Sequence, residues 1–459
     1  MSPIDRSRLP VPVADRPFHF PRIVKRSLPN GLELRAVTHR SVPLAAIVLL
    51  VPGGSSVDPA EAHGLVSITA GLLDEGSRGH SALEIADRVA RMGGDLDLDV
   101  GMDAVVIGLT TLDRFLDAGL SLLHEIVTEP NLANDDFNRI RNLRLERLRQ
   151  MKDHAGAMAE RAFAHVLYGD HPYGHLPLGS EAALNRLTVE EIRTLHAAMF
   201  TPGGSTLVVV GDRPEDELLD AAAAVFAQWR PAAAATPVDR DAALAPAPDR
   251  PAVKLATIAR PGAAQSELRI GHACAPRSTP DYHVLLILNT ILGGDFVSRL
   301  NSNLREQKGF TYGVRTGFNL RRGTGPFVMQ TSVGTDVTAA ALTEAWREIR
   351  EISTTRPVTD AEVAQAFASV SKGYPRGFET AGQVARSVAQ LALHGLPDSY
   401  FEEFVPKLAQ VSASDVTRVA QRYLDPDKMT TVIVGDLDKI AGTLAGLGLG
   451  PHRVMTIEP

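Results

Sequence analysis

The chain has 459 residues, too many for a single hydrophobic core, so we expect two or more domains. Hydrophobic residues make up 44% of the sequence and charged residues 22%, which is typical of a soluble globular protein. A net charge of −7 excludes the basic character that favours nucleic acid or anionic membranes, and the single cysteine, Cys274, excludes an intramolecular disulfide or a multi-cysteine metal site.

The N-terminal residues 1–21 contain charges and prolines but no apolar run of signal-peptide length. The most apolar early segment, residues 44–51, has the length of a strand, far below the roughly 20 residues of a membrane span. We therefore expect a cytoplasmic protein without a membrane span. A periplasmic protein whose signal peptide had been removed would have the same sequence features.

The first half of the chain is predicted to mix strands and helices. The turn Pro29-Asn30-Gly31 joins two alternating runs into a hairpin at 23–37, and a buried strand follows at 42–52. Ser81 and Glu84 have the capping-box spacing at the start of a helix at 81–92. Further helices are predicted at 64–75, 112–128, 131–167 and 188–200, a strand pair at 95–111 and a strand at 206–210.

The composition changes at residues 231–251, which are rich in alanine and proline and have no apolar periodicity. Such a segment is typical of a linker. We therefore divide the chain into an N-terminal domain at 1–230, a linker at 231–251 and a C-terminal domain at 252–459. In the last of these, strands are predicted at 268–272, 310–318 and 326–333, and helices at 282–291, 295–308 and onward through residue 420.

An internal repeat relates the two halves. Residues 187–212 align without gaps with residues 411–436, so the two copies begin 224 residues apart. Each copy predicts a helix capped by Thr188 or Ser412, then a proline and a β-branched strand that ends in Val-Gly-Asp. The sequence therefore predicts two tandem homologous domains of the α+β class.

The stretch at 304–314, Leu-Arg-Glu-Gln-Lys-Gly-Phe-Thr-Tyr-Gly-Val, is predicted to form a corner between a helix and a strand. We expect Asp295 to cap the helix, Lys308 to lie in its last turn and Gly309 to follow its end in a left-handed conformation. This corner would bring the side chains of Arg305 and Tyr312 to one place. The plain alternative is an exposed arginine at a helix end and an unrelated strand tyrosine.

Together with the duplicated halves and the segment Tyr-Gly-Asp-His-Pro-Tyr-Gly at 168–174, this stretch resembles the M16 (pitrilysin or insulinase-like) metallopeptidases. The likeness is greatest to the two-domain subgroup that includes the mitochondrial processing peptidases, and it covers the chain from about residue 23. It implies that each domain is a mixed, mostly antiparallel sheet packed with helices. It also implies that two subunits, or two fused halves, close around a chamber.

The resemblance places the family's zinc motif, His-x-x-Glu-His, on the helix at 64–75. Its two histidine positions fall on Ser67 and Gly71, its glutamate position falls on Ala70, and the third-ligand position falls near Glu146. Two histidines one turn apart and a carboxylate are needed to hold zinc, and none of the three motif residues can serve. We therefore expect no metal in this chain. The other histidines considered, at 63, 124, 165, 171 and 175, do not have the spacing of a substitute site.

Arg305 and Tyr312 match the family's arginine–tyrosine pair, which the resemblance implies to face the zinc across the chamber and to donate to the carbonyl oxygens of the scissile region. The family's substrate-pairing sheet edge falls on residues 93–99, where Asp97-Leu98 replaces the usual Asn-Ala. Three alternating acids there suggest a solvated, charge-protected edge rather than a peptide groove.

These observations predict a zinc-free, degenerate subunit of a heterodimeric M16-like peptidase that is inactive alone. The expected partner is a homologous subunit with an intact His-x-x-Glu-His and bound zinc, and the expected substrate is a peptide or small unfolded protein. The main alternative is an inactive scaffold protein, akin to the core subunits of respiratory complexes. A self-sufficient peptidase, or a module that captures peptides without cutting them, would also have this fold.

Overall fold

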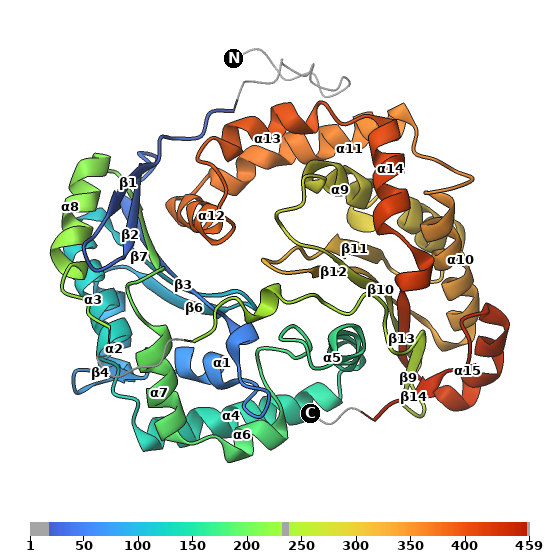
Figure 1. Ribbon diagram of the computed structural model, residues 1–459, viewed down its shortest axis with the longest axis horizontal. Coiled ribbons are helices and arrows are strands. Elements are labelled where there is room, and N and C mark those ends of the chain that lie inside the picture. Colours follow the sequence, from blue (N-terminus) through green and yellow to red (C-terminus); the bar gives the residue numbers. More distant parts are fainter. Residues whose placement is uncertain (1–17, 232–237, 457–459) are drawn as a thin grey trace, which may run out of the picture.

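The computed structural model describes residues 18–231 and 238–456, which form two halves that face each other (Figure 1). The sheet of the first half has the strand order β1-β2-β8-β3-β7-β6. Only β2 and β8 are parallel, so the sheet is mixed and mostly antiparallel, as expected. Its strands are β1 (Val24–Ser27), β2 (Glu33–Thr38), β3 (Leu44–Pro52), β6 (Asp95–Val100), β7 (Ala104–Leu112) and β8 (Thr206–Gly211).

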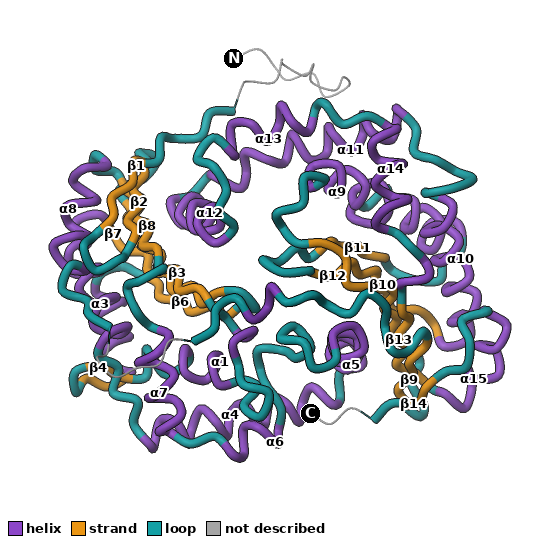
Figure 2. Tube along the Cα trace, in the orientation of Figure 1, coloured by secondary structure: helices purple, strands orange, loops and turns teal. Residues whose placement is uncertain are grey.

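The sheet of the second half has the order β11-β12-β10-β13-β9-β14. The central order β6-β7-β3-β8-β2 of the first sheet therefore recurs as β11-β12-β10-β13-β9, with β13 and β9 again parallel. These strands are β9 (Leu255–Ala259), β10 (Gln265–Ala275), β11 (Val314–Phe318), β12 (Gly325–Gly334), β13 (Thr430–Gly435) and β14 (Arg453–Val454). Figure 2 shows the two sheets on opposite sides of the molecule.

The sequence repeat corresponds to the same structure in both halves. Helix α7 (Val189–Met199) and helix α14 (Ala413–Tyr423) each begin with a capping box, at Thr188 and Ser412. The strands that follow them, β8 and β13, begin at residues 206 and 430, which keeps the shift of 224 residues. The gapless alignment therefore identified homologous elements.

The first-half helices differ from expectation at two places. The helix expected at 64–75 ends at Ala70, because the chain turns at Gly71. The helix expected at 131–167 is broken at His154, whose backbone is extended, into two helices. The helices of this half are α1 (Leu65–Ala70), α2 (Ala82–Arg91), α3 (Leu116–Thr128), α4 (Asn134–Lys152), α5 (Ala155–Tyr168), α6 (Glu181–Arg186), α7 and α8 (Glu215–Phe226).

In the second half, the corner that carries Arg305 and Tyr312 differs from the expected helix and strand. Helix α9 continues into two π-helical segments, Thr290–Gly294 and Asn301–Gln307. Asp295 ends the first segment with an extended backbone and does not cap the second. Gly309 has the expected positive φ of 66°. The other helices are α9 (Tyr282–Asn289), α10 (Thr338–Glu351), α11 (Asp360–Gly373), α12 (Ala381–Leu393), α13 (Tyr400–Leu408), α14 and α15 (Leu437–Leu444).

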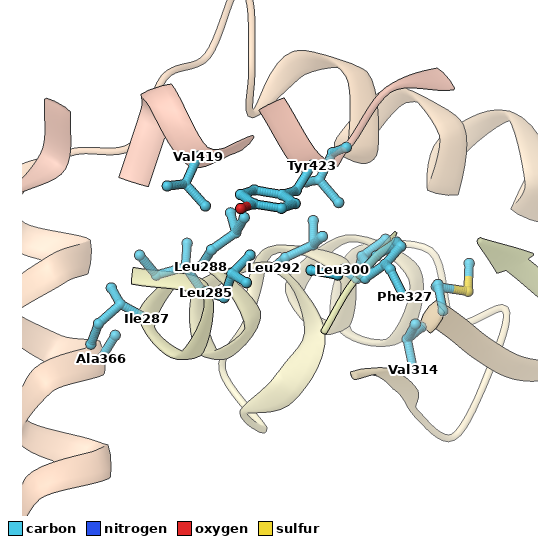
Figure 3. Close-up of a cluster of buried hydrophobic side chains, with 14 of the residues drawn as sticks. Leu285, Ile287, Leu288, Leu292, Leu300, Val314, Phe327, Ala366, Val419 and Tyr423 are labelled. Atoms are coloured by element: carbon cyan, nitrogen blue, oxygen red, sulfur yellow. The ribbon is translucent and has the colours of Figure 1, made fainter. Parts of the chain in front are cut away.

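A buried apolar cluster holds this corner in place. Leu292 and Leu300, one from each side of the extended residue, are fully buried against the sheet residues Val314 and Phe327 (Figure 3). Fully burying such side chains contributes about 1.5–3 kcal/mol each. The corner is therefore part of the second-half core.

Each half covers the other half's sheet with one helix. Helix α12 of the second half packs on β3 and β8 of the first, and helix α5 of the first half packs on β10 and β13 of the second (Figure 1). Val388 of α12 lies in one buried cluster with Val48, Leu50 and Val208 of the first sheet. Since each sheet needs the opposite half to bury its inner face, the two halves form one interlocked unit.

The part of the expected linker from residue 238 onward runs against the protein surface. Residues 232–237 lie outside the described residues, but beyond them Arg240 donates hydrogen bonds to the carbonyl oxygens of Met199 and Gly203 at 2.8 and 2.9 Å. The carbonyl of Arg240 in turn accepts from Arg322 of the second half. From residue 238 onward the segment is therefore held by both halves.

A half-buried histidine, His283, should make the stability depend on pH. His283 of α9 packs against the rings of Tyr400 and Phe404, and burial, together with the charge of Lys407, lowers its pKa from 6.5 to about 4. Below pH 6.5 the unfolded chain takes up a proton that the folded chain refuses until about pH 4, so stability falls as the pH is lowered through this window. We expect urea unfolding of His283→Phe to show a smaller loss between pH 7 and pH 5 than the unchanged chain, whereas equal losses would contradict this assignment.

Candidate functional site

Arg305 and Tyr312 line the same cavity of about 620 Å³, at the open edge of the second sheet. Arg305 comes from the π-helical segment, whereas Tyr312 lies two residues before β11 rather than within it. The corner predicted from sequence therefore does bring the two residues to one cavity. The residues that share it include Glu267, Arg269, Phe296, Arg315 and Gln330.

The guanidinium of Arg305 is fixed by its own chain. Its Cζ lies 3.4 Å from the centroid of the Phe296 ring, and Nη2 donates to the Phe296 carbonyl oxygen at 2.8 Å. Nε donates to Glu306 at 2.8 Å, and only 14% of the side chain is exposed. An arginine has five N–H donors, so about three remain free to bind a ligand.

Tyr312 has the opposite environment. It is 95% exposed, and Phe296 beside the same cavity is 69% exposed. Large apolar side chains that are exposed side by side are typical of surfaces that bind another molecule. The cavity therefore combines a fixed cation with an unshielded aromatic rim.

Asn301 positions this corner, and the sequence reading missed it. Its side-chain amide donates to the carbonyl of Val314 at 2.9 Å and accepts from the Val314 amide at 2.8 Å. The side chain of Asn301 thus pairs with the backbone of Val314 as a neighbouring strand would. These two hydrogen bonds fix the π-helical segment to the start of β11. The sequence did contain a signal for Asn301, because a polar residue stands there at a position that the apolar helical pattern predicts to be buried.

The three zinc-motif positions lie on α1 and its C-terminal turn. Ser67 and Ala70 are buried, and Gly71 follows the last helical residue. The guanidinium of Arg144, from α4, lies against these positions and donates to the hydroxyl and the carbonyl oxygen of Ser67 at 2.8 and 2.7 Å. The residues present do not fit a zinc ion, because they supply no ligand and a cation faces them.

Glu146, at the expected third-ligand position, is exposed to solvent. On an α-helix, residues two positions apart in sequence point in directions that differ by roughly 200°. Glu146 therefore lies on the side of α4 opposite to Arg144. The side of α4 that faces α1 carries Arg144. Among the described residues, no group of three or more histidines, cysteines or acids is placed to hold a metal ion.

Two histidines of the first half, His63 and His175, lie beside the start of α1. His175 stacks on His63 with 3.9 Å between ring centroids, and its Nε2 lies 3.2 Å from the carboxylate of Asp58. That carboxylate accepts hydrogen bonds from the backbone amides of Gly64 and Val66, both at 2.7 Å, at the start of α1. These contacts satisfy amides that a helix N-terminus leaves without a partner.

The segment at 168–174 connects the halves. Tyr173 donates to Asp103 at 2.5 Å, and the same carboxylate accepts from the backbone amide of Arg322 in the second half. Tyr168 donates to the carbonyl of Thr324, also in the second half. This sequence signature therefore marks a contact between the halves.

The acidic edge strand β6 differs in part from the solvated edge that we expected. Asp97 forms an ion pair with Arg386 of α12, so this acid is engaged by the other half. Asp95 and Asp99 on the same strand are exposed. In the first sheet β6 pairs only with β7, which leaves its outer backbone edge open.

Comparisons with known proteins support the family resemblance. Residues 186–370 match the family model described as Peptidase M16 inactive domain. The crystal structure of a peptidase M16 inactive domain from Pseudomonas fluorescens superimposes with a TM-score of 0.81 at 26% identity, covering 90% of this chain and 98% of that chain. This chain is similar along most of its length to proteins of the M16 peptidase family.

Two relatives of the chain come from one organism, Helicobacter pylori. The non-peptidase homolog YmxG is 21% identical over 430 residues, which cover 89% of this chain and 96% of the relative. The zinc protease PqqE is 22% identical over 425 residues, which cover 91% and 93%. This chain is thus similar along most of its length to a relative named a protease and to one named a non-peptidase. None of its described helices combines the length and hydropathy that a bilayer crossing requires.

Proposed function

We propose that this chain is the zinc-free subunit of a heterodimeric M16-like peptidase in the cytoplasm. A homologous partner with an intact His-x-x-Glu-His supplies the zinc and the general base, and this chain supplies Arg305 and Tyr312. The observation that carries the proposal is the exposure of Tyr312, at 95%, in a cavity shared with a fixed arginine, in a chain whose own motif positions hold no metal ligand. A phenol so exposed is available to a neighbouring molecule.

The proposed chemistry is transition-state stabilisation by hydrogen-bond donors. When water attacks a peptide carbonyl, negative charge develops on its oxygen, and the free N–H groups of Arg305 and the hydroxyl of Tyr312 would donate to that oxygen or to the neighbouring carbonyls. The stack on Phe296 and the bond to Glu306 hold the guanidinium in one orientation. Donors fixed in advance need no reorganisation during the reaction.

The names of the relatives fit a two-subunit arrangement. Helicobacter pylori has a non-peptidase homolog and a zinc protease of this family, and each aligns with about nine tenths of this chain. The proposed substrate is a peptide or small unfolded protein, since a chamber enclosed by two subunits would admit only an extended chain.

Reconstitution tests the proposal. This chain, a homologous chain bearing His-x-x-Glu-His, and their mixture are assayed for hydrolysis of an internally quenched peptide. We expect each chain alone to be nearly inactive, the mixture to be active, and the two to co-elute in size-exclusion chromatography. Full activity of the zinc-bearing chain without this one would contradict the proposal.

The alternative is an inactive scaffold of the same fold. It is favoured by the engagement of Arg305 with Phe296 and Glu306, which a structural role alone would explain. A scaffold would form the complex equally well, but hydrolysis by that complex would not respond to replacement of Arg305 or Tyr312.

A further inference from the structure

We infer that Arg144 takes the place of the metal in this chain, as a fixed positive charge that joins α4 to α1 and excludes divalent cations from the motif positions. In the family that this chain resembles, the metal joins the motif helix to a ligand on the later helix. Here a side chain of the later helix makes that connection itself. The inference does not depend on a partner subunit or on peptide hydrolysis.

The first support is the geometry of the contact. Nη1 of Arg144 donates to the Ser67 hydroxyl at 2.8 Å and Nη2 donates to the Ser67 carbonyl at 2.7 Å. Ser67 stands at the first histidine position of the motif. Both hydrogen bonds therefore end at the position where the motif has a zinc ligand. A guanidinium that binds two oxygens of one residue is fixed in orientation as well as in position.

The second support is the glycine at the other histidine position. A Cβ added to Gly71 would lie 3.1 Å from Nη2 of Arg144, closer than an ordinary van der Waals contact. The guanidinium therefore lies against the position that a side chain at residue 71 would occupy. Any side chain there requires the guanidinium to shift by a few tenths of an ångström, and the imidazole of a histidine extends further toward it.

The third support is electrostatic. The six-residue helix α1 has the carboxylate of Asp58 at its N-terminus and the guanidinium of Arg144 near its C-terminus. This is the charge order that the helix dipole favours at each end. Burial lowers the pKa of Arg144 to about 10, so the group keeps its charge at neutral pH. A half-buried permanent cation repels a divalent cation strongly, because the local dielectric constant is lower than that of water.

Zinc binding by engineered variants tests the inference. We compare S67H/G71H, which restores both histidines beside Arg144, with S67H/G71H/R144E, which also places a carboxylate on the side of α4 that faces α1. The matched control, S67H/G71H/R147E, makes the same charge change at the exposed Arg147. Circular dichroism monitors the folding of each variant. The zinc content after dialysis gives the stoichiometry, and competition with a chelator gives the affinity.

We expect stoichiometric zinc only in S67H/G71H/R144E, with an affinity at least about a hundredfold above that of the other two variants. Equal zinc binding by S67H/G71H would overturn the inference, because Arg144 would then not exclude the metal. Binding restored equally by R147E would overturn it as well, since net charge rather than position would be responsible.

A second measurement keeps the inference testable if the histidine variants do not fold. In the otherwise unchanged chain, Arg144→Gln should increase hydrogen exchange of the α1 amides by about tenfold or more, since two charge-assisted bonds to Ser67 are weakened. Arg147→Gln should leave α1 unchanged. Unchanged α1 exchange in Arg144→Gln would show that the arginine does not hold the helix.

Discussion

Arg305→Ala is expected to lower peptide hydrolysis by the reconstituted heterodimer by about a hundredfold or more, in kcat more than in KM. The proposed role of the guanidinium is to donate to charge that develops only in the transition state, so its loss raises the barrier without preventing substrate binding. Tyr312→Phe removes only a hydroxyl from a residue that is 95% exposed, and it should act in the same direction with no effect on folding. Steady-state kinetics with a saturating amount of each variant measures both effects.

The control for this experiment is Arg91→Ala, which removes an arginine from the exposed surface of α2 and should leave turnover unchanged. Size-exclusion chromatography establishes that every variant still assembles with the partner. Wild-type turnover by assembled Arg305→Ala and Tyr312→Phe complexes would refute the catalytic role and support the scaffold alternative.

Leu50→Ala is expected to destabilise both halves together, by about 2–5 kcal/mol. Leu50 is a buried residue of β3 whose cluster contains residues of α12, so its truncation opens a cavity where the second half covers the first sheet. Because each sheet depends on a helix from the other half, we expect a single unfolding transition that shifts as a whole. Urea unfolding followed by tryptophan fluorescence and circular dichroism measures it, with Trp229 and Trp346 reporting on the two halves.

Leu83→Ala provides the matched comparison, since Leu83 is 82% exposed and its truncation should change stability by less than about 0.5 kcal/mol. Two separate transitions in Leu50→Ala, with only the first-half signal displaced, would show that the halves are independent domains joined by a linker.

The local features were predictable because their causes are local. The turn at Asn30-Gly31, the Ser81–Glu84 capping box and the 224-residue repeat all depend on residues within a few positions of one another or on direct sequence comparison. The exchange of α5 and α12 between the halves was not predictable. An amphipathic helix shows that it has an apolar face, but its sequence does not say which sheet covers that face.

The corner at Arg305 does bring Arg305 and Tyr312 to one cavity, but its secondary structure differs from the predicted helix and strand. Gly309 ends the helical segment as expected, but the segment is π-helical, Asp295 does not cap it, and the strand begins at Val314. The side chain of Asn301 forms hydrogen bonds with the backbone N–H and carbonyl of Val314, the first residue of β11. The start of the strand is therefore bonded to a side chain instead of to another strand.

Arg144 could not be identified from the residue types that bind zinc, because these are acids, cysteines and histidines. A signal was present, since residues 137, 141, 144 and 148 of α4 follow the spacing of one helix face, and Phe137 and Leu148 are buried. An arginine on that face needs a buried acceptor. Glu146, near the expected third-ligand position, is exposed on the side of α4 that faces away from α1.

Zinc analysis of the two chains separated from an active heterodimer tests the central claim most directly. We predict stoichiometric zinc in the chain bearing His-x-x-Glu-His and none in this chain, with activity lost when the motif glutamate of the partner is replaced by glutamine. Stoichiometric zinc in this chain, with activity that survives that replacement, would contradict the account.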